Sequence, residues 1–397
     1  MNKNLNILIF APLALENGRG GEISAMELAS GLQKDYNITL IDTNIFIGKK
    51  LLNEESIKIK LKNVSKSDRI KFATFHLFNK TFTFPYPWEI IKLSKNIKKQ
   101  DILYTSLHTI KLNLILILFS LFYRQLRFII GYRKPIYSKK LFSLYNIKFR
   151  ISILLFSIFK KRFYHHTISY HAKKYLENFY EPHKVVHVIH GIELDNFIKE
   201  QSFSEKNDNL LKFIYIGYLD DVHKGVGVLI KGIRKVLNEE KIRNIFFEFC
   251  GAGPLGIELK KLEREFPQFI KYHGYISNES IPEYYRKSDV LLFSSRREPF
   301  GRVIIEALAS KLLILSTKTF GSMEILKNQP FSFFIDKLES KYIKKKIYEI
   351  YNIWTKERER FIELKELAQK YAIKRYDYSN EIQGFINLIN KITSKNN

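Results

Sequence analysis

One segment in the last third of the chain predicts a strand, a loop and a helix in direct succession. The apolar run 289–293 has the length and composition of a buried strand, and residues 302–309 carry Ile, Ala and Leu at helical spacing. A polar loop with Glu298 and Pro299 lies between them. In open parallel sheets, ligands bind beside loops that follow the carboxyl ends of strands. The segment therefore predicts an α/β domain with a ligand site at this loop.

The start of this helix suits a bound anion between two acids. Gly301 and Arg302 begin the helix, where backbone N–H groups have no partner within the helix and attract a phosphate. Glu306 comes eight positions after Glu298, slightly more than two helical turns, so both carboxylates can face one pocket. A phosphate site beside two acids favours an enzyme that binds a phosphorylated sugar.

The same segment resembles the E-x7-E element of retaining glycosyltransferases of family 4 (glycosyl transferases group 1). Further stretches resemble other elements of this family and follow its order: residues 18–29, 188–197, 213–225, 249–254 and 272–275. The resemblance implies an α/β chain with the GT-B fold, in which two Rossmann-like, doubly wound domains face a central cleft.

Short apolar runs alternate with helical patterns along the chain, which independently predicts parallel sheets with crossover helices. A chain of 397 residues is too long for one ordinary core. The polar stretch 199–209 has no apolar face and is typical of a linker. We therefore expect one domain over 1–198 and another over 210–375. The resemblance implies that the first is the acceptor-side domain and the second the nucleotide-sugar-binding domain. The resemblance implies that a C-terminal helix within 376–397 packs back on the first domain.

The expected strands of the first domain cover residues 6–11, 38–41, 102–105, 128–130, 167–169 and 185–189. Those of the second domain cover 213–217, 246–250, 269–272, 290–294 and 313–316. Helices are expected at 22–32, 112–121 and 379–392. The stretch 58–84 has too little periodicity to predict its elements.

Two glycines and a lysine suit the binding of a diphosphate. Gly20 and Gly21 lie between a strand and a helix, where paired glycines let backbone amides approach an anion, although a plain turn is the alternative. The resemblance implies that their loop faces the donor diphosphate and the transferred sugar. Lys224 follows strand 213–217 and matches the family's Arg-x5-Lys-Gly pattern, which implies a positive charge on the leaving diphosphate. An exposed lysine without a role is the alternative.

The chain departs from this pattern at Tyr218, which stands where the family has arginine. A phenol donates a hydrogen bond but adds no positive charge, so one of two cations expected beside the departing nucleotide is missing. His223 and Arg302 are candidates to replace it. The departure motivates a second hypothesis, in which the chain is a catalytically weak GT-B partner subunit or a glycan-binding protein.

The resemblance gives the two glutamates different roles. Glu298 would hold hydroxyls of the donor sugar and act with Lys224 as the catalytic pair, and Glu306 would hold the ribose hydroxyls. Carboxylates suit both tasks because they accept two hydrogen bonds from a diol. The resemblance also implies that the donor is bound by Phe300, Gly301, Arg302, Gly253 and Tyr275.

Histidines give no clear metal site. The family often has a histidine near the reacting sugar, but the corresponding stretch 131–134 has none. His108 is a candidate pocket residue, with a structural role as the alternative. The cluster of His165, His166 and His171 lacks a nearby Asp or Cys, and no Asp-x-Asp motif is present. We therefore expect no metal and no cofactor apart from the nucleotide-diphosphate sugar, which is a substrate.

The chain is strongly basic, with 66 Lys and Arg against 40 Asp and Glu, a net charge of +26. Genomic base composition is one explanation and attraction to an anionic surface is the other. Basic residues are mixed with aromatic and aliphatic ones over 123–134 and 149–163, as in segments at a water–lipid interface. No nucleic-acid-binding motif accompanies them. We expect peripheral membrane association in preference to nucleic-acid binding.

Three further features bear on location. The single cysteine, Cys250, excludes an internal disulfide, fits a reducing compartment and is typical of a small buried residue. Residues 1–10 lack the pattern of a signal peptide, and the longest apolar run, 112–123, is too short to span a bilayer. We therefore expect a cytoplasmic protein, peripheral on the inner face of the cell membrane. The resemblance implies that it transfers a sugar, with retention, to a lipid-linked or envelope glycan acceptor.

Overall fold

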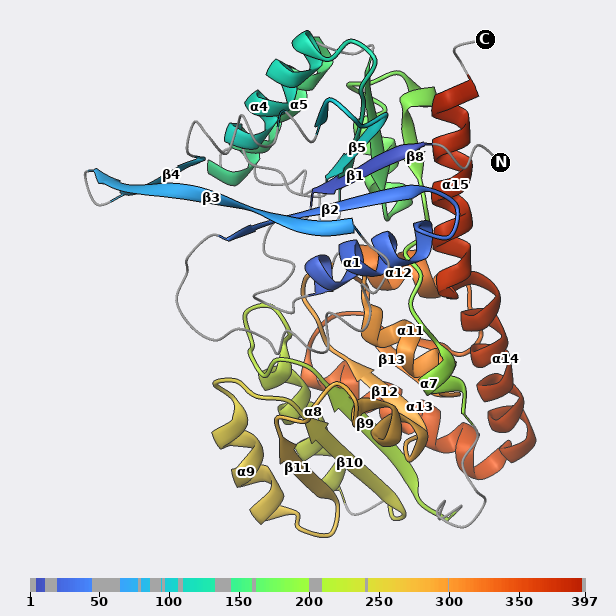
Figure 1. Ribbon diagram of the computed structural model, residues 1–397. Helices are drawn as coiled ribbons and strands as arrows, with labels where there is room; N and C mark the ends of the chain where they lie inside the picture. The colour runs from blue at the N-terminus through green and yellow to red at the C-terminus, as the bar shows by residue number, and fades with distance from the viewer. Residues whose placement is uncertain are drawn as a thin grey trace. The chain divides into compact units, whose positions relative to one another are not determined.

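The computed structural model (Figure 1) describes residues 5–10, 20–44, 65–77, 80–85, 94, 97–105, 110–132, 144–158, 162–199, 209–239, 242–298 and 300–394. The chain divides into two compact units. The first combines residues 1–188 with 382–397, and the second contains residues 189–381.

The first unit contains an eight-stranded sheet in the order β4-β3-β2-β1-β5-β6-β7-β8. Its strands are β1 Asn6–Phe10, β2 Asn37–Asn44, β3 Ser65–Leu77, β4 Lys80–Pro85, β5 Ile102–Thr105, β6 Arg127–Tyr132, β7 Phe163–Thr167 and β8 Val185–His187. All neighbouring strands are parallel except β3 and β4, which are antiparallel. The order reverses between β1 and β5, which is the switch point of a doubly wound sheet.

The helices of the first unit are α1 Gly20–Leu32, α4 Ile110–Phe122, α5 Leu144–Ile158 and α6 Tyr170–Leu176, with a short 3-10 turn at Pro182–Lys184. The last helix, α15 Tyr378–Ser394, contributes its residues from Ile382 onward to this unit.

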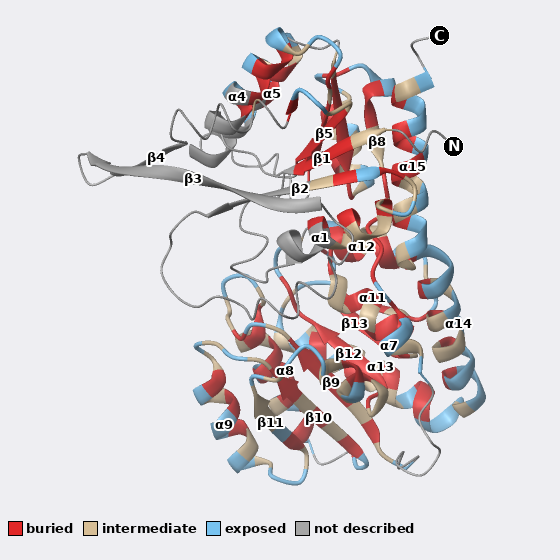
Figure 2. Cartoon of the chain, viewed as in Figure 1, coloured by how far each residue is buried: buried red, intermediate tan, exposed pale blue. Residues whose placement is uncertain are grey.

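Successive residues of the central strands enter two different cores, as the strand period of two requires. Leu8 and Leu103 pack in the core below α4 and α5, whereas Ile9 and Tyr104 pack in the core with α1 and α15. Strand β5 is buried over its whole length and β1 over residues 7–9, as the red of both strands in Figure 2 shows. The apolar runs read from the sequence are therefore strands covered on both faces.

The second unit contains a parallel six-stranded sheet in the order β11-β10-β9-β12-β13-β14. Its strands are β9 Leu211–Ile216, β10 Ile245–Cys250, β11 Ile270–Gly274, β12 Val290–Phe293, β13 Leu313–Thr317 and β14 Ser332–Ile335. Its helices are α7 Asp195–Ile198, α8 Val226–Leu237, α9 Gly256–Glu265, α10 Ile281–Arg286, α11 Arg302–Ala309, α12 Phe320–Leu326, α13 Ser340–Lys356 and α14 Arg358–Tyr376. Numbered within the unit, the strand order is 3-2-1-4-5-6, so the switch point lies between β9 and β12.

The prediction of two doubly wound α/β sheets is confirmed. One strand was misplaced: the expected strand at 167–169 is β7 at Phe163–Thr167, because its two histidines are buried among aromatic rings and do not mark a loop. No strand was predicted at β14, and β3 and β4 lie in or at the end of the stretch 58–84, whose elements were not predicted. The predicted linker falls largely on residues 200–208, outside the described residues.

Residues 189–198 pack within the second unit. Ile192 pairs with Asp377, and Gly191 lies so close to the backbone of Asp377 that a side chain would not fit. Across the described residues, no helix combines the length and apolar character needed to cross a membrane.

Gly251, which follows β10, and Gly274, the last residue of β11, allow a test of how close backbone approach affects stability. Gly251 has a φ of +145°, and a Cβ there would overlap the carbonyl oxygen of Gly217, whereas Gly274 has a φ of +73° with nothing within 4 Å of an added Cβ. We expect Gly251→Ala to lower the free energy of unfolding by about 3 kcal/mol. Gly274→Ala, with backbone strain alone, should cost about 1 kcal/mol. Urea unfolding measures both, and equal losses would contradict the close approach at Gly251.

Candidate functional site

The loops after β9 and β12 lie side by side at the switch point of the second sheet. The two strands are parallel neighbours, with Phe213 opposite Val290, so both chains leave the sheet at the same edge. The Ser294 hydroxyl donates to the Lys224 carbonyl at 2.7 Å. The Arg296 amide donates to the His223 carbonyl at 2.8 Å. These bonds fix one loop against the other.

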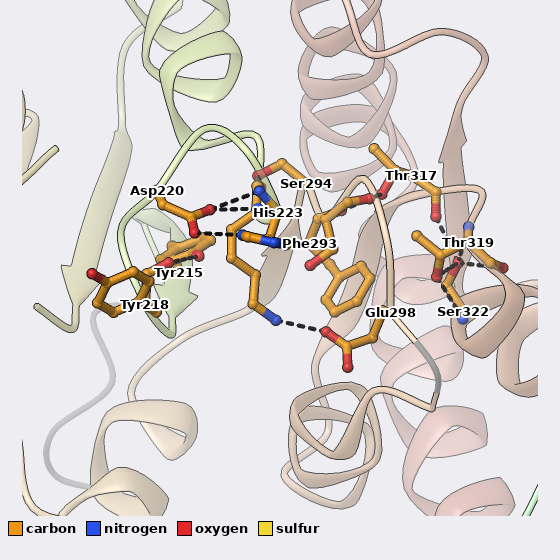
Figure 3. Close-up of polar contacts among 12 residues, drawn as sticks. Tyr215, Tyr218, Asp220, His223, Phe293, Ser294, Glu298, Thr317, Thr319 and Ser322 are labelled. Carbon is orange, nitrogen blue, oxygen red and sulfur yellow. Dashed lines mark hydrogen bonds and ion pairs between the residues drawn. The ribbon is translucent and has the colours of Figure 1, made fainter. Parts of the chain in front are cut away.

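An ion pair connects the two predicted catalytic residues across these loops (Figure 3). The Lys224 Nζ lies 2.6 Å from Glu298 Oε2, and the two side chains are 29% and 17% exposed. The Glu298 carbonyl accepts a hydrogen bond from the Gly321 amide at 3.0 Å, which ties this loop to α12. A cation and a carboxylate, both partly accessible to solvent, are thus held at the carboxyl edge of the sheet.

Asp220 shapes the turn that carries the lysine. Its carboxylate accepts hydrogen bonds from the backbone amides of His223 and Lys224 at 2.9 and 2.8 Å, and from the His223 ring at 3.0 Å. Burial raises the pKa of this carboxyl, but the bonds from Lys224 and His223 outweigh burial and leave the pKa below its usual value. Asp220 is therefore ionised at neutral pH and holds the turn.

The backbone geometry at Gly225, which follows Lys224, requires a glycine. It has a φ of +65° and forms the N-cap of α8. A Cβ there would lie 2.5 Å from the carbonyl oxygen of Ser294. Only glycine allows this close approach between the turn and the end of β12.

Tyr218 presents its ring to solvent. Its side chain is 56% exposed, and its carbonyl accepts a hydrogen bond from the Tyr215 hydroxyl at 2.9 Å. The two candidates for the missing cation each lie beside a carboxylate: His223 beside Asp220, and Arg302 with its Nε 3.8 Å from Glu306. The departure from the family pattern therefore places an accessible aromatic ring at this position.

The loop after β12 ends in the predicted helix start. Gly301, with a φ of +96°, is the N-cap of α11, which begins at Arg302. Phe300 is 5% exposed, and its backbone lies against Gly321, where an added Cβ would stand 2.6 Å from the Phe300 nitrogen. The first turn of α11 thus follows a tightly packed turn, and the Ile304 amide in it donates to the Gly301 carbonyl at 2.9 Å.

Glu306 lies one helical turn into α11 with its side chain 13% exposed. The Tyr285 hydroxyl is 3.4 Å from its carboxylate and also donates to the Val303 carbonyl at 3.3 Å. Burial raises the pKa of Tyr285 well above its usual value, and the nearby Glu306 adds to this. Tyr285 therefore stays neutral and supports a carboxylate that is held in place but still reached by solvent.

The sequence reasoning missed a buried pair behind Phe300. His190 Nδ1 lies 2.9 Å from Glu381 Oε2, and the same oxygen accepts from the Gly191 amide at 2.9 Å. The His190 ring centroid is 5.1 Å from that of Phe300. Residues 188–197 did resemble a family element, but nothing local signals a carboxylate almost two hundred positions later.

The remaining predicted donor-binding residues are spread over other elements. Gly253 has a φ of +155° and packs against the backbone of Leu219, so the backbone geometry alone explains why this residue is a glycine. Tyr275 follows β11 and is 77% exposed. Gly20 and Gly21 are the first residues of α1 in the first unit, and the loop 11–19 before them is outside the described residues. Their roles stay predictions.

Two of the three clustered histidines, His165 and His166, are buried in the first unit. The His165 ring stacks on Tyr180 at 3.6 Å, and its Nδ1 is 3.0 Å from the Tyr132 hydroxyl. His108 and residues 133–134 lie outside the described part of the chain. Within that part, no three His, Cys, Asp or Glu side chains group as metal ligands. Cys250 is buried, and burial raises the pKa of its thiol to about 12.

The chain is similar in sequence to known proteins, and the family match falls within the second unit. Residues 196–367 match the family model of Glycosyl transferases group 1. An uncharacterized glycosyltransferase of Methanocaldococcus jannaschii is 25% identical over 157 residues, or 37% of this chain and 39% of its own length. The phosphatidylinositol N-acetylglucosaminyltransferase gpi3 subunit of Schizosaccharomyces pombe is 26% identical over 148 residues, or 36% of this chain and 31% of its own length. The sequence match thus spans less than half of these relatives.

Solved structures extend the fold match to both units. A glycosyltransferase of Rickettsia africae superposes with a TM-score of 0.73 at 19% identity, covering 99% of this chain and 100% of that one. The Anabaena protein HepE, crystallised with UDP and glucose, superposes with a TM-score of 0.69 at 17% identity, covering 97% and 99%. The chain therefore has the GT-B fold, and Lys224, Glu298 and Glu306 lie within residues 196–367, the stretch that matches the group 1 family model.

Proposed function

We propose that the chain is a retaining glycosyltransferase that moves a sugar from a nucleotide-diphosphate sugar to a lipid-linked or envelope glycan acceptor. The observation that carries this proposal is the Lys224–Glu298 pair, held at 2.6 Å across the switch point of a doubly wound sheet. Sheets of this type bind nucleotides at that place. A lysine there neutralises a leaving diphosphate, and a carboxylate there holds the hydroxyls of a sugar.

The comparison structures support a nucleotide-sugar donor. HepE was crystallised with UDP-glucose as well as with UDP and glucose, and the pneumococcal O-GlcNAc transferase GtfA with UDP and GlcNAc. In this chain we assign the diphosphate to Lys224 and the first amides of α11, and the ribose to Glu306. The proposed donor contacts thus come from the loops after β9 and β12 and from α11.

Charge on the leaving group is the centre of the proposed mechanism. As the anomeric bond breaks, negative charge grows on the diphosphate, and Lys224 and the amides at the start of α11 stabilise it. Glu298 accepts hydrogen bonds from the donor sugar and orients its anomeric carbon. We propose that these groups suffice without a divalent metal ion, and that the acceptor oxygen enters on the face from which the diphosphate leaves.

The names of two relatives favour a lipid-linked or envelope glycan as the acceptor. The Schizosaccharomyces pombe relative is named as a subunit of a phosphatidylinositol N-acetylglucosaminyltransferase, and a Klebsiella pneumoniae relative is named as an uncharacterized protein in a cps region. A lipid-linked or envelope glycan acceptor would place this chain at the inner face of the cell membrane, bound peripherally.

Tyr218 favours a second candidate. With an exposed phenol in place of a cation, the donor site has less positive charge than the family pattern provides. In this alternative the chain is a catalytically weak partner subunit or a glycan-binding protein that keeps the fold.

Donor binding gives the first test. We expect one of a panel of UDP-, GDP- and ADP-sugars to raise the melting temperature of the full chain, because a ligand at a hundred times its Kd stabilises the native state by about 2.7 kcal/mol. Glu306→Gln should abolish most of this shift. The control is Glu258→Gln, at an exposed carboxylate on α9, which should leave the shift unchanged. Absence of a shift with every donor would contradict donor binding.

Turnover separates the two candidates. Lys224→Ala should lower the transfer rate by about a hundredfold to a thousandfold, as loss of a group that stabilises transition-state charge does. Lys231→Ala, at an exposed position on α8, is the matched control. Tyr218→Arg should raise the rate about tenfold by restoring the second cation. An unmeasurable rate in the wild-type chain, gained only with Tyr218→Arg, would support the catalytically weak alternative.

Stereochemistry is tested separately. We expect the product linkage to keep the anomeric configuration of the donor sugar, read from the anomeric proton coupling by NMR. An inverted product would refute the retaining mechanism and leave donor binding intact.

A further inference from the structure

Two neighbouring helices of the first unit expose large apolar side chains. They are Leu114, Leu118, Leu121 and Phe122 on α4 and Ile151, Leu154 and Ile158 on α5, and all are between 42% and 77% exposed. We call these seven side chains the α4–α5 face. Figure 2 shows exposed positions along both helices.

The spacing of these residues forms one row on each helix. Positions 114, 118 and 121 on α4, and 151, 154 and 158 on α5, follow the helical repeat of three and four. The opposite sides are buried: Leu116 and Phe119 of α4 and Phe156 of α5 belong to one core. Both helices are therefore apolar on the side that faces solvent as well as on the side that faces the sheet.

The two rows lie on the same side of the sheet. Helix α4 connects β5 to β6, and α5 connects β6 to β7, through parallel strands that are adjacent in that order. Right-handed crossovers in one direction place both helices on one face. The shared core of the two helices agrees with this. Their exposed rows therefore form one outward surface, which exceeds the scattered apolar residues of an ordinary surface.

The surrounding sequence has charge of one sign. From Ile102 to Leu176 the chain has 14 Lys and Arg and no Asp or Glu, so this span contributes +14 of the net +26. It encloses both helices and their flanking segments. Arg124, just after α4, and Arg150, within α5, are exposed.

We propose that the α4–α5 face docks on an anionic lipid bilayer. Its apolar side chains enter the boundary between headgroups and acyl chains, and the exposed Arg124 and Arg150 contact the headgroups. An acid-free span complements anionic lipid, whereas two copies of this face repel each other by their like charge. This inference does not depend on the transferase chemistry.

Vesicle co-sedimentation of the full chain tests the proposal. We expect binding to vesicles of phosphatidylcholine with phosphatidylglycerol, and much weaker binding to phosphatidylcholine alone. The double variant Leu118→Ser/Phe122→Ser should lower the partition coefficient on the anionic vesicles at least about tenfold, because two apolar side chains no longer enter the lipid. Ile257→Ser, at a 67% exposed position on α9, is the matched control and should bind like the wild-type chain.

The electrostatic part is measured in the same assay. Arg124→Gln/Arg150→Gln should weaken binding several-fold at low salt, and this difference should shrink at high salt because ions screen the attraction. Both double variants change exposed side chains and should keep the wild-type melting temperature and any donor-induced shift. Failure of vesicle binding is therefore distinguishable from failure of donor binding.

Two results would overturn the proposal. One is equal binding of wild-type and Leu118→Ser/Phe122→Ser chains to anionic vesicles. The other is a wild-type dimer in sedimentation velocity that the same variant converts to a monomer, without a vesicle-binding difference, which would make a second copy the occupant.

Discussion

The reversal of strand order between β9 and β12 is the constraint on which the candidate site depends. Strands on either side of this point connect to helices on opposite faces of the sheet. The loops after β9 and β12 start side by side and lead toward opposite faces, and sheets of this kind bind ligands at the point where such loops separate. Here those loops are joined by the Ser294–Lys224 hydrogen bond and the Lys224–Glu298 ion pair. The chemistry proposed for Lys224 and Glu298 thus follows from a topological feature, and the local contacts set the distance.

Close backbone approach is the second requirement of this edge. Gly225 lies against Ser294, Gly251 against Gly217, and Gly321 against Phe300, and in each case a Cβ would meet backbone atoms. These glycines allow loops from different strands to pack without side chains between them. The same requirement explains why glycines recur in the stretches that resemble the family, whether or not they contact a ligand.

Elements that follow from local sequence patterns could be predicted, whereas contacts between residues far apart in the sequence could not. The strands β5 and β12 and the helix α11 follow apolar runs and helical spacing. Lys224 and Glu298 were each expected after a strand, but the ion pair between them was not predicted. The support of Glu306 by Tyr285, and the His190–Glu381 pair behind Phe300, join residues with no shared local pattern. Strand β7 was misplaced because polarity alone does not reveal a histidine buried by aromatic stacking.

The turn held by Asp220 fixes the backbone of Lys224 but not the position of its ammonium group. Its backbone is fixed by the Asp220 carboxylate and by Ser294, whereas its ammonium group sits at the end of a flexible stem. An anion that draws the ammonium away from Glu298 changes side-chain rotamers and leaves the loop in place. The reorganisation then consists of exchanging the ion pair with Glu298 for one with the anion, without a change in the backbone. The ammonium group can move with a departing anion while the backbone of the loop stays in place.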